Sequence, residues 1–343
     1  MIKAGLLGWL RFLPIGEAAL PGWGMACIAA GLSGAFGGAI AGLAQREAKT
    51  VLAYSSISQM GLITAAVGVG MLSPESWTLI VPAIWLYALH HAAAKAALFL
   101  GAGVAAGVGT RRWERRMVLA GLALPALALA GVPFTSGAAA KVALKTSIES
   151  APSTLVELTL SIAAVGTTLL MARFLVLVWP PKPSNVGPLA AGIAIPWLVL
   201  LAGVAGAVWL LPWTGFQRAA LQSLAPASLW TTLWPPAVGI AIAWCVWRMP
   251  AVAVPASTVK IPAGDLLSPL TRLLDGARAI ARDKEWRRSV SASLASLRLP
   301  PLNVSTLPRY ATTVEAGLQR WDVAGVLVLA LAAMLFALLA RFD

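Results

Sequence analysis

Apolar runs of about 20 residues recur along most of this chain, and they limit its fold more than any other feature. A helix of that length spans the hydrocarbon core of a lipid bilayer. Only 11% of the residues are charged, against about 25% in soluble domains. We therefore predict an all-α polytopic membrane protein with about 8–9 transmembrane helices. After a short run at 2–13, the longer runs lie near residues 22–44, 50–71, 78–106, 117–133, 137–179, 189–211, 229–249 and 322–341.

The basic residues are typical of membrane topology signals and do not indicate a nucleic-acid surface. The net charge is +13, but the lysines and arginines form short clusters between apolar runs, with no basic face interleaved with aromatic residues. The loops at 45–49 and 110–116 are basic, whereas the loop at 73–76 is not. The positive-inside rule then places the basic loops in the cytoplasm, so we expect a multi-pass protein of the bacterial inner (plasma) membrane.

Hydropathy divides the chain into four segments. Residues 1–180 carry most of the apolar runs, and 181–249 carry two additional transmembrane helices. Residues 250–321 are basic and partly amphipathic, which predicts a helical segment on the cytoplasmic surface or against neighbouring subunits. An ordinary cytoplasmic linker is the alternative for this segment. A final transmembrane helix is expected in residues 322–343.

One run is too long for a single straight helix. Residues 137–179 contain Gly137, Pro152 and Gly166, which predicts a broken helix with its break in mid-membrane. Such breaks are tolerated in a membrane where protein or a water-filled cavity satisfies the freed backbone groups. A broken helix is therefore a first indication of a functional site, and a kinked structural helix is the alternative.

His91 and Lys95 lie within the apolar run at 78–106. A charged side chain at the centre of a membrane helix costs about 2.5–3.5 kcal/mol, so such residues indicate ion pathways. The two are spaced i, i+4 and share one face of the helix, where they can exchange a proton through water. The alternative is that Lys95 extends to the headgroups. His90 faces away from the pair, and we expect a structural role for it.

A second titratable group follows the "GVPFTSG" stretch at 131–137. Lys141 and Lys145 lie one turn apart there, Glu149 and Glu157 are positioned to compensate their charge, and Lys3 lies in the first short run. Titratable groups spread along a membrane protein in this way favour proton or cation movement. The sequence shows no catalytic nucleophile, no metal-ligand set and no cofactor cradle, so we predict neither a metal nor a cofactor.

Four stretches resemble one family in order and spacing. The chain is similar to the antiporter-like subunits of respiratory complex I, of Mrp-type cation/proton antiporters and of energy-converting membrane hydrogenases. The resemblance covers about residues 1–180, on four motifs: "MIKAGLLGWLRFLP" (1–14), "QREAKTVLAYSSISQMGLI" (45–63), "HHAAAKAALFLGAG" (90–103) and "GVPFTSGAAAK" (131–141).

The resemblance implies a proton relay. Members of the family are built from two inverted repeats of five helices, and this chain resembles the second repeat. His91 and Lys95 match the central helix of that repeat, Lys141 matches the lysine of its broken helix, and Lys3 matches the connecting lysine. A polar line that holds ordered water is implied for Tyr54, Ser55, Ser58 and Gln59, with Lys145, Glu149 and Glu157 in support.

Three functions remain open from the sequence. The first is a proton-translocating subunit of a redox-driven complex of the NADH:quinone oxidoreductase or hydrogenase type, itself a non-redox channel within a translocase. The second is a cation/proton antiporter subunit of Mrp type, or a subunit of an ion-coupled bicarbonate-uptake complex. The third is a non-conducting scaffold. In each, we expect other membrane subunits as partners, including a chain or segment that supplies the first repeat.

Overall fold

The computed structural model describes residues 2–13, 16–108, 112–149, 154–179, 191–210, 216–248 and Asp275. The chain divides into two compact units, Met1–Asp265 and Leu266–Asp343, and the account below concerns the first. The expected segment at 250–321 and the expected final helix at 322–343 lie outside the described residues, apart from Asp275.

Within the described ranges the chain is helical, and it contains no strand there. Five helical stretches are long and apolar enough to cross a membrane, namely Pro21–Leu43, Ala48–Leu72, Pro74–Gly107, Leu158–Val178 and Ser228–Arg248. The helices, in chain order, are α1 (Ile2–Phe12), α2 (Pro21–Leu43), α3 (Ala48–Leu72), the 3₁₀ turn η1 (Pro74–Ser76), α4 (Trp77–Gly107), α5 (Arg112–Ala130), α6 (Ser136–Glu149), α7 (Thr154–Val178), α8 (Ala191–Leu210), α9 (Phe216–Ser223) and α10 (Pro226–Arg248).

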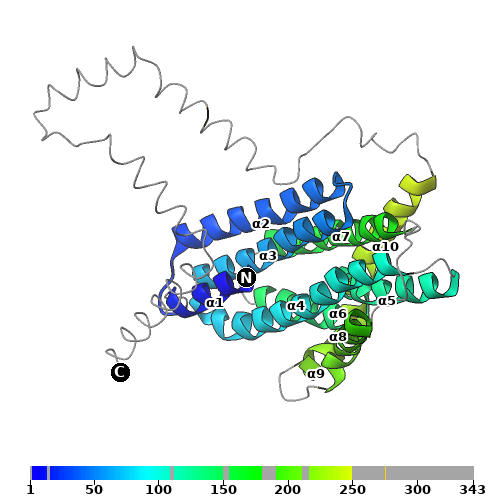
Figure 1. Ribbon diagram of the computed structural model, residues 1–343. Coiled ribbons are helices and arrows are strands. Elements are labelled where there is room, and N and C mark those ends of the chain that lie inside the picture. The colour runs from blue at the N-terminus through cyan, green and yellow to red at the C-terminus, as the bar shows by residue number, and fades with distance from the viewer. Residues whose placement is uncertain are drawn as a thin grey trace, which may run out of the picture. The chain divides into compact units, whose positions relative to one another are not determined.

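Glycines bring α2 and α3 into close contact along a seam. A Cβ atom on Gly31 would lie 2.5 Å from the carbonyl oxygen of Gly61, and one on Gly24 would lie 2.8 Å from that of Gly68. Small residues at such positions let membrane helices approach closely enough for their backbones to touch. Helices α2, α3 and α7 run side by side (Figure 1), so this seam forms one rigid wall of the bundle.

The predicted interruption of the run at 137–179 is present. The run at 137–179 forms two separate helices, α6 and α7, and Gly166 lies within the unbroken α7. A second interruption falls at residues 131–135, between α5 and α6. Gly131 has φ +87° and Phe134 has φ +67° there, so the backbone turns in conformations that a continuous helix does not use.

Helix α8 packs against α4 and α5 through a buried tryptophan. The indole Nε1 of Trp197 donates a hydrogen bond to the carbonyl oxygen of Ala97 at 3.0 Å. Side chains at Gly101 and Gly121 would collide with the ring, because their Cβ atoms would lie 2.5 Å from it. These contacts hold α8 beside the part of α4 that contains Lys95.

Candidate functional site

Lys95 is buried inside the bundle and bonded to a neighbouring helix. Its side chain is 5% exposed, and its Nζ donates a hydrogen bond to the carbonyl oxygen of Leu52 on α3 at 2.8 Å. Ser56 Oγ donates to the same carbonyl oxygen at 3.1 Å. The ammonium group of Lys95 is therefore held by an oxygen of the packed interior of the bundle.

A row of three polar side chains runs along α4 on the face that includes Lys95. Tyr87, His91 and Lys95 are spaced i, i+4 and i+8, which places them above one another on one helix face. All three are buried, and His91 is 2% exposed. At a rise of 1.5 Å per residue, the row spans about 12 Å along the helix axis.

Gln59 connects this row to two other helices. The hydroxyl of Tyr87 donates a short hydrogen bond to Gln59 Oε1, and Gln59 Nε2 donates to Thr167 Oγ1 on α7 at 2.7 Å. Thr167 Oγ1 in turn donates to the carbonyl oxygen of Ala163 at 3.0 Å. The amide of Gln59 is thus fixed between α4 and α7, within the polar line expected on α3.

The other members of that line are also buried. Tyr54, Ser55 and Ser58 are each at most 6% exposed. Among the described residues, the hydroxyls of Ser55 and Ser58 have no hydrogen-bond partner. Buried hydroxyls in folded proteins are nearly always bonded to protein or ordered water. Residues 52, 55 and 59 follow the helical i, i+3, i+7 spacing, so Ser55 lies between the Lys95 contact and Gln59.

Lys141 occupies a pocket at the Tyr87 end of the row. Its Nζ donates to the carbonyl oxygen of Ala130, at the end of α5, at 2.7 Å. A Cβ on Gly131 would lie 2.7 Å from Lys141 Cδ, so only glycine leaves room for this side chain. The pocket is partly open, and its lining includes Tyr87, Lys141, Lys145 and Ser161.

Helix α10 forms the opposite wall of the Lys141 pocket, with Thr231, Thr232, Pro235 and Pro236. Proline has no backbone N–H, so the carbonyl groups four residues earlier, those of Thr231 and Thr232, lack their helical donors. Both threonine hydroxyls donate to the carbonyl oxygen of Ser228 at 2.9 Å, which leaves their oxygens to act as acceptors. The α10 wall therefore presents hydrogen-bond acceptors to the pocket.

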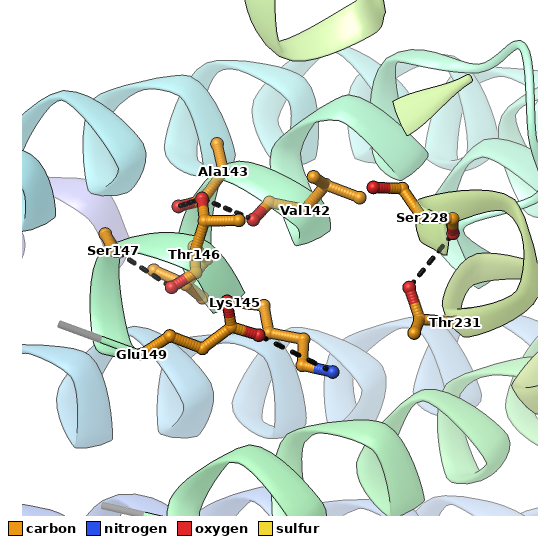
Figure 2. Close-up of polar contacts among 9 residues, drawn as sticks. Val142, Ala143, Lys145, Thr146, Ser147, Glu149, Ser228 and Thr231 are labelled. Carbon is orange, nitrogen blue, oxygen red and sulfur yellow. Dashed lines mark hydrogen bonds and ion pairs between the residues drawn. The ribbon is translucent and has the colours of Figure 1, made fainter. Parts of the chain in front are cut away.

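Lys145 faces this wall from α6. Its Nζ lies 3.8 Å from Glu149 Oε1, as charge compensation along α6 predicts. Figure 2 shows this pair on α6, with Thr231 and its bond to Ser228 across from it. The other predicted compensating acid, Glu157, and the predicted connecting lysine, Lys3, lie on α7 and α1, but the structure does not describe their side chains.

His90 makes the contact that joins α4 to the start of α6. Its side chain is 5% exposed, and its Nδ1 lies 2.8 Å from Ser136 Oγ. This geometry fits the structural role expected for it. Among the described residues no group of three or more His, Cys, Asp or Glu residues has a geometry that could hold a metal ion.

Sequence reasoning missed Tyr87 and the α10 residues. The spacing of Tyr87 four residues before His91 was a usable signal, because it places the hydroxyl on the same helix face. For α10 the only signal was "TTLWPP" at 231–236. No spacing rule relates that segment to Lys141, so its role depends on how the helices pack.

The sequence of residues 1–167 matches the family described as "NADH:quinone oxidoreductase/Mrp antiporter, TM". Residues 1–167 thus have the sequence of an antiporter-like membrane subunit of the complex I/Mrp family. The match includes Lys95, His91 and Lys141 and ends within α7. Helices α8 and α10 lie beyond it, although they pack against the matched part.

Relatives and a solved structure in this antiporter-like family agree with that assignment. The antiporter subunit mnhA2 of Staphylococcus haemolyticus is 31% identical over 208 residues, covering 54% of this chain and 26% of the relative. Its Staphylococcus aureus counterpart is 34% identical over 156 residues, covering 40% of this chain and 19% of the relative. The structure of the Mrp complex from Dietzia sp. DQ12-45-1b matches 98% of this chain and 40% of that chain, with a TM-score of 0.62 and 25% identity.

The chain thus spans about a quarter or less of the length of these curated relatives. The family assignment and the apolar helices together make it an integral membrane protein with the antiporter-like fold.

Proposed function

We propose that this chain is a proton-conducting subunit of a cation/proton antiporter of Mrp type. The observation that carries the proposal is the buried row on α4, which has Lys95 at one end and Tyr87 at the border of the Lys141 pocket at the other. Lysines bonded to backbone carbonyl oxygens inside a membrane-spanning bundle are costly to keep. Such a cost is typical of groups that take up and release ions.

The proposed path uses each group of the row in turn. A proton on Lys95 passes to His91, one helical turn away, and on toward Tyr87, which bonds to Gln59 and borders the Lys141 pocket. Histidine suits the middle position because it takes up and releases protons near neutral pH. Lys141 then releases the proton to water in its pocket beside α10, on the way out of the protein.

Water is part of this proposal. Neighbouring groups along α4 are about 6 Å apart along the axis, which is too far for direct proton transfer and is bridged by one or two water molecules. The buried hydroxyls of Ser55 and Ser58 suit such waters, since they have no hydrogen-bond partner among the described residues. A buried water typically makes about three hydrogen bonds to groups of this kind.

The Mrp type is favoured over a redox-driven complex by the relatives reported above. Each is named as an antiporter subunit or as part of an Mrp complex. On this proposal the chain works among other membrane subunits, and another chain or segment of the complex supplies the first repeat. The coupled ion moving against protons is then a monovalent cation.

The test is to replace Lys95 or Lys141 with alanine in the assembled complex. Proton movement driven by an imposed sodium gradient is measured in everted membrane vesicles with a pH-sensitive dye. We expect each substitution to lower the exchange rate at least tenfold while complex assembly is kept, because a relay cannot pass a proton through a missing titratable group.

Lys49→Ala is the matched control, since it removes the same charge from an exposed position at the start of α3. It should leave the exchange rate unchanged. Full exchange by assembled complexes that carry Lys95→Ala or Lys141→Ala would contradict the proposal and favour the scaffold function. Proton movement that follows a redox substrate and ignores sodium would favour the redox-driven function.

A further inference from the structure

We propose that His90 is a positioning residue for Lys141, acting through Ser136. The inference rests on the proton-conducting function proposed above, since it assigns a role within the same site. The row of Tyr87, His91 and Lys95 lies on one face of α4, while His90 lies on another face and contacts the start of α6. Helix α6 carries Lys141, so a contact that fixes the start of α6 also fixes where that lysine lies.

The segment between α5 and α6 has a strained backbone. Phe134 has φ +67°, a left-handed conformation that bulky residues seldom adopt. Its side chain is 69% exposed, so burial of the ring does not stabilise this conformation. Strained residues persist only where the surrounding structure holds them in place. The contacts that hold residues 131–137 are therefore the ones to identify.

Side-chain hydrogen bonds hold the segment. Thr135 Oγ1 donates to the carbonyl oxygen of Val132 at 2.6 Å and accepts from the backbone N–H of Ala138 at 3.4 Å. Lys141 Nζ donates to Ala130 O on one side. The Ser136 hydroxyl pairs with His90 Nδ1 at 2.8 Å on the other side, and this bond attaches the segment to α4.

Close packing leaves His90 little freedom to move away. A Cβ on Gly137 would lie 3.0 Å from His90 Nε2 and 1.6 Å from the carbonyl oxygen of Ala128. The imidazole thus borders α6 at Gly137, where the backbone of α6 lies against the carbonyl oxygen of Ala128 on α5. The ring of Tyr87 meets it edge-on, with the ring centroids 6.5 Å apart. His90 is therefore a rigid support between the relay helix and the segment that precedes Lys141.

The function of this support is to keep Lys141 directed at its pocket. If the bond between His90 and Ser136 is lost, residues 131–135 can relax from the strained conformation, and α6 shifts at its first turn. Lys141 lies five residues after Ser136, so a small shift there changes its distance from the Tyr87 end of the row. Proton transfer through water is sensitive to such distances, whereas folding of the bundle depends on contacts elsewhere.

The test compares four variants in the assembled complex, with sodium-driven proton movement as the readout. His90→Ala and Ser136→Ala are each expected to lower the exchange rate about tenfold, as the loss of a buried hydrogen bond allows. The double variant is expected to be no slower than either single variant, because both changes remove the same bond. His90→Asn is expected to restore most of the rate, since asparagine can bond to Ser136 from a similar position.

A second substitution tests whether His90 acts by positioning Lys141 or only by stabilising the fold, because the two roles predict different exchange rates. Phe134→Gly removes the strain, because glycine adopts positive φ readily. The double variant His90→Ala with Phe134→Gly is therefore expected to recover at least half of the lost rate. Ser223→Ala is the matched control, since its buried hydroxyl bonds within α9 to Ala220, and it should keep the full rate.

Two outcomes would overturn the inference: full exchange in Ser136→Ala or His90→Ala, or losses in these two variants that multiply in the double variant. The Lys95 and Lys141 variants separate this failure from failure of the proposed function. If they abolish exchange while the His90 and Ser136 variants are normal, only the positioning role is wrong. If they too exchange normally, the proton-conducting function itself is wrong.

Discussion

Tyr87 illustrates how a single hydroxyl joins two parts of the site. It borders the Lys141 pocket and donates a hydrogen bond to Gln59, which in turn bonds to Thr167. It is also one turn from His91 on the same face of α4. At the scale of single residues, this hydroxyl is the group that links the buried row to the pocket.

We expect Tyr87→Phe to lower sodium-driven proton movement severalfold. The ring stays in place, but Gln59 Oε1 loses its donor, and an unsatisfied buried acceptor costs about 1–3 kcal/mol. Thr159→Val is a suitable control, because that hydroxyl bonds to Val156 within its own helix. An unchanged exchange rate in Tyr87→Phe would remove the hydroxyl from the path.

Residue spacing predicted part of this arrangement. The i, i+4 relation placed His91 and Lys95 on one face, and the pair at Lys145 and Glu149 followed from the same rule. The partners of the lysines did not follow from any spacing. Leu52 and Ala130 contribute backbone carbonyl oxygens, and every residue has such a group, so sequence carries no signal for which carbonyl is used.

At the scale of helices, α10 has the least expected role. From the sequence, residues 181–249 are expected to form two additional transmembrane helices, and no site residue is predicted in them. In the structure α10 packs against α7 and forms a wall of the Lys141 pocket. The two prolines in the middle of this helix leave two carbonyl groups of that wall without helical donors.

We expect Pro235→Ala to slow exchange severalfold while the protein stays folded. Alanine restores a backbone N–H that bonds to the carbonyl of Thr231, so the pocket wall loses an acceptor, and the helix itself becomes more regular. Pro196→Ala is the matched control, because Pro196 also lies inside a helix, α8, but is not among the residues that line this pocket.

Thermal unfolding in detergent separates the two effects of the Pro235 change. The melting temperature of Pro235→Ala should be equal to that of the unchanged protein or higher, since proline is unfavourable in a helix interior. A lower melting temperature accompanied by slower exchange would instead indicate that the change disturbs the packing of α10.

The interruption between α5 and α6, next to Lys141, is a second feature at the scale of helices. Glycine and proline in the run at 137–179 indicated an interruption, and α6 and α7 are separate helices. The interruption next to Lys141, however, lies at residues 131–135. It includes Pro133 and the positive-φ residues Gly131 and Phe134. The runs predicted at 117–133 and 137–179 leave a gap at this place, but run lengths do not predict the positive φ angles of Gly131 and Phe134.

At the scale of the whole molecule, the helices leave large apolar side chains exposed on their outer faces. On α2 these include Trp23, Met25 and Ile40, which are 71%, 59% and 68% exposed. Lipid or neighbouring membrane subunits cover such faces in an integral membrane protein. The chain matches 40% of a chain in the Mrp complex of Dietzia, and our proposal places it among other subunits.

We therefore expect an affinity-tagged version of the chain, solubilised from its own cells in a mild detergent, to copurify with other multi-span membrane proteins. The purified chain alone, reconstituted in liposomes, should not exchange sodium for protons, because on our proposal another chain or segment of the complex supplies the first repeat. The Lys141→Ala variant serves as the assembly control and should copurify with the same partners. Exchange by the isolated chain at the rate of the assembled complex would contradict this prediction.

The amino-acid sequence alone determined that this is a helical membrane protein similar to antiporter-like subunits, with lysines and a histidine inside its apolar runs. Those conclusions depend on composition, run length, motifs and local spacing, which are properties of the chain itself. Only the tertiary structure decided that Lys95 bonds to α3, that Gln59 reaches α7, that His90 contacts Ser136 at the start of α6 and that α10 lines the Lys141 pocket. These contacts join residues far apart in the chain, and they depend on which helix faces pack together, which helical periodicity does not specify.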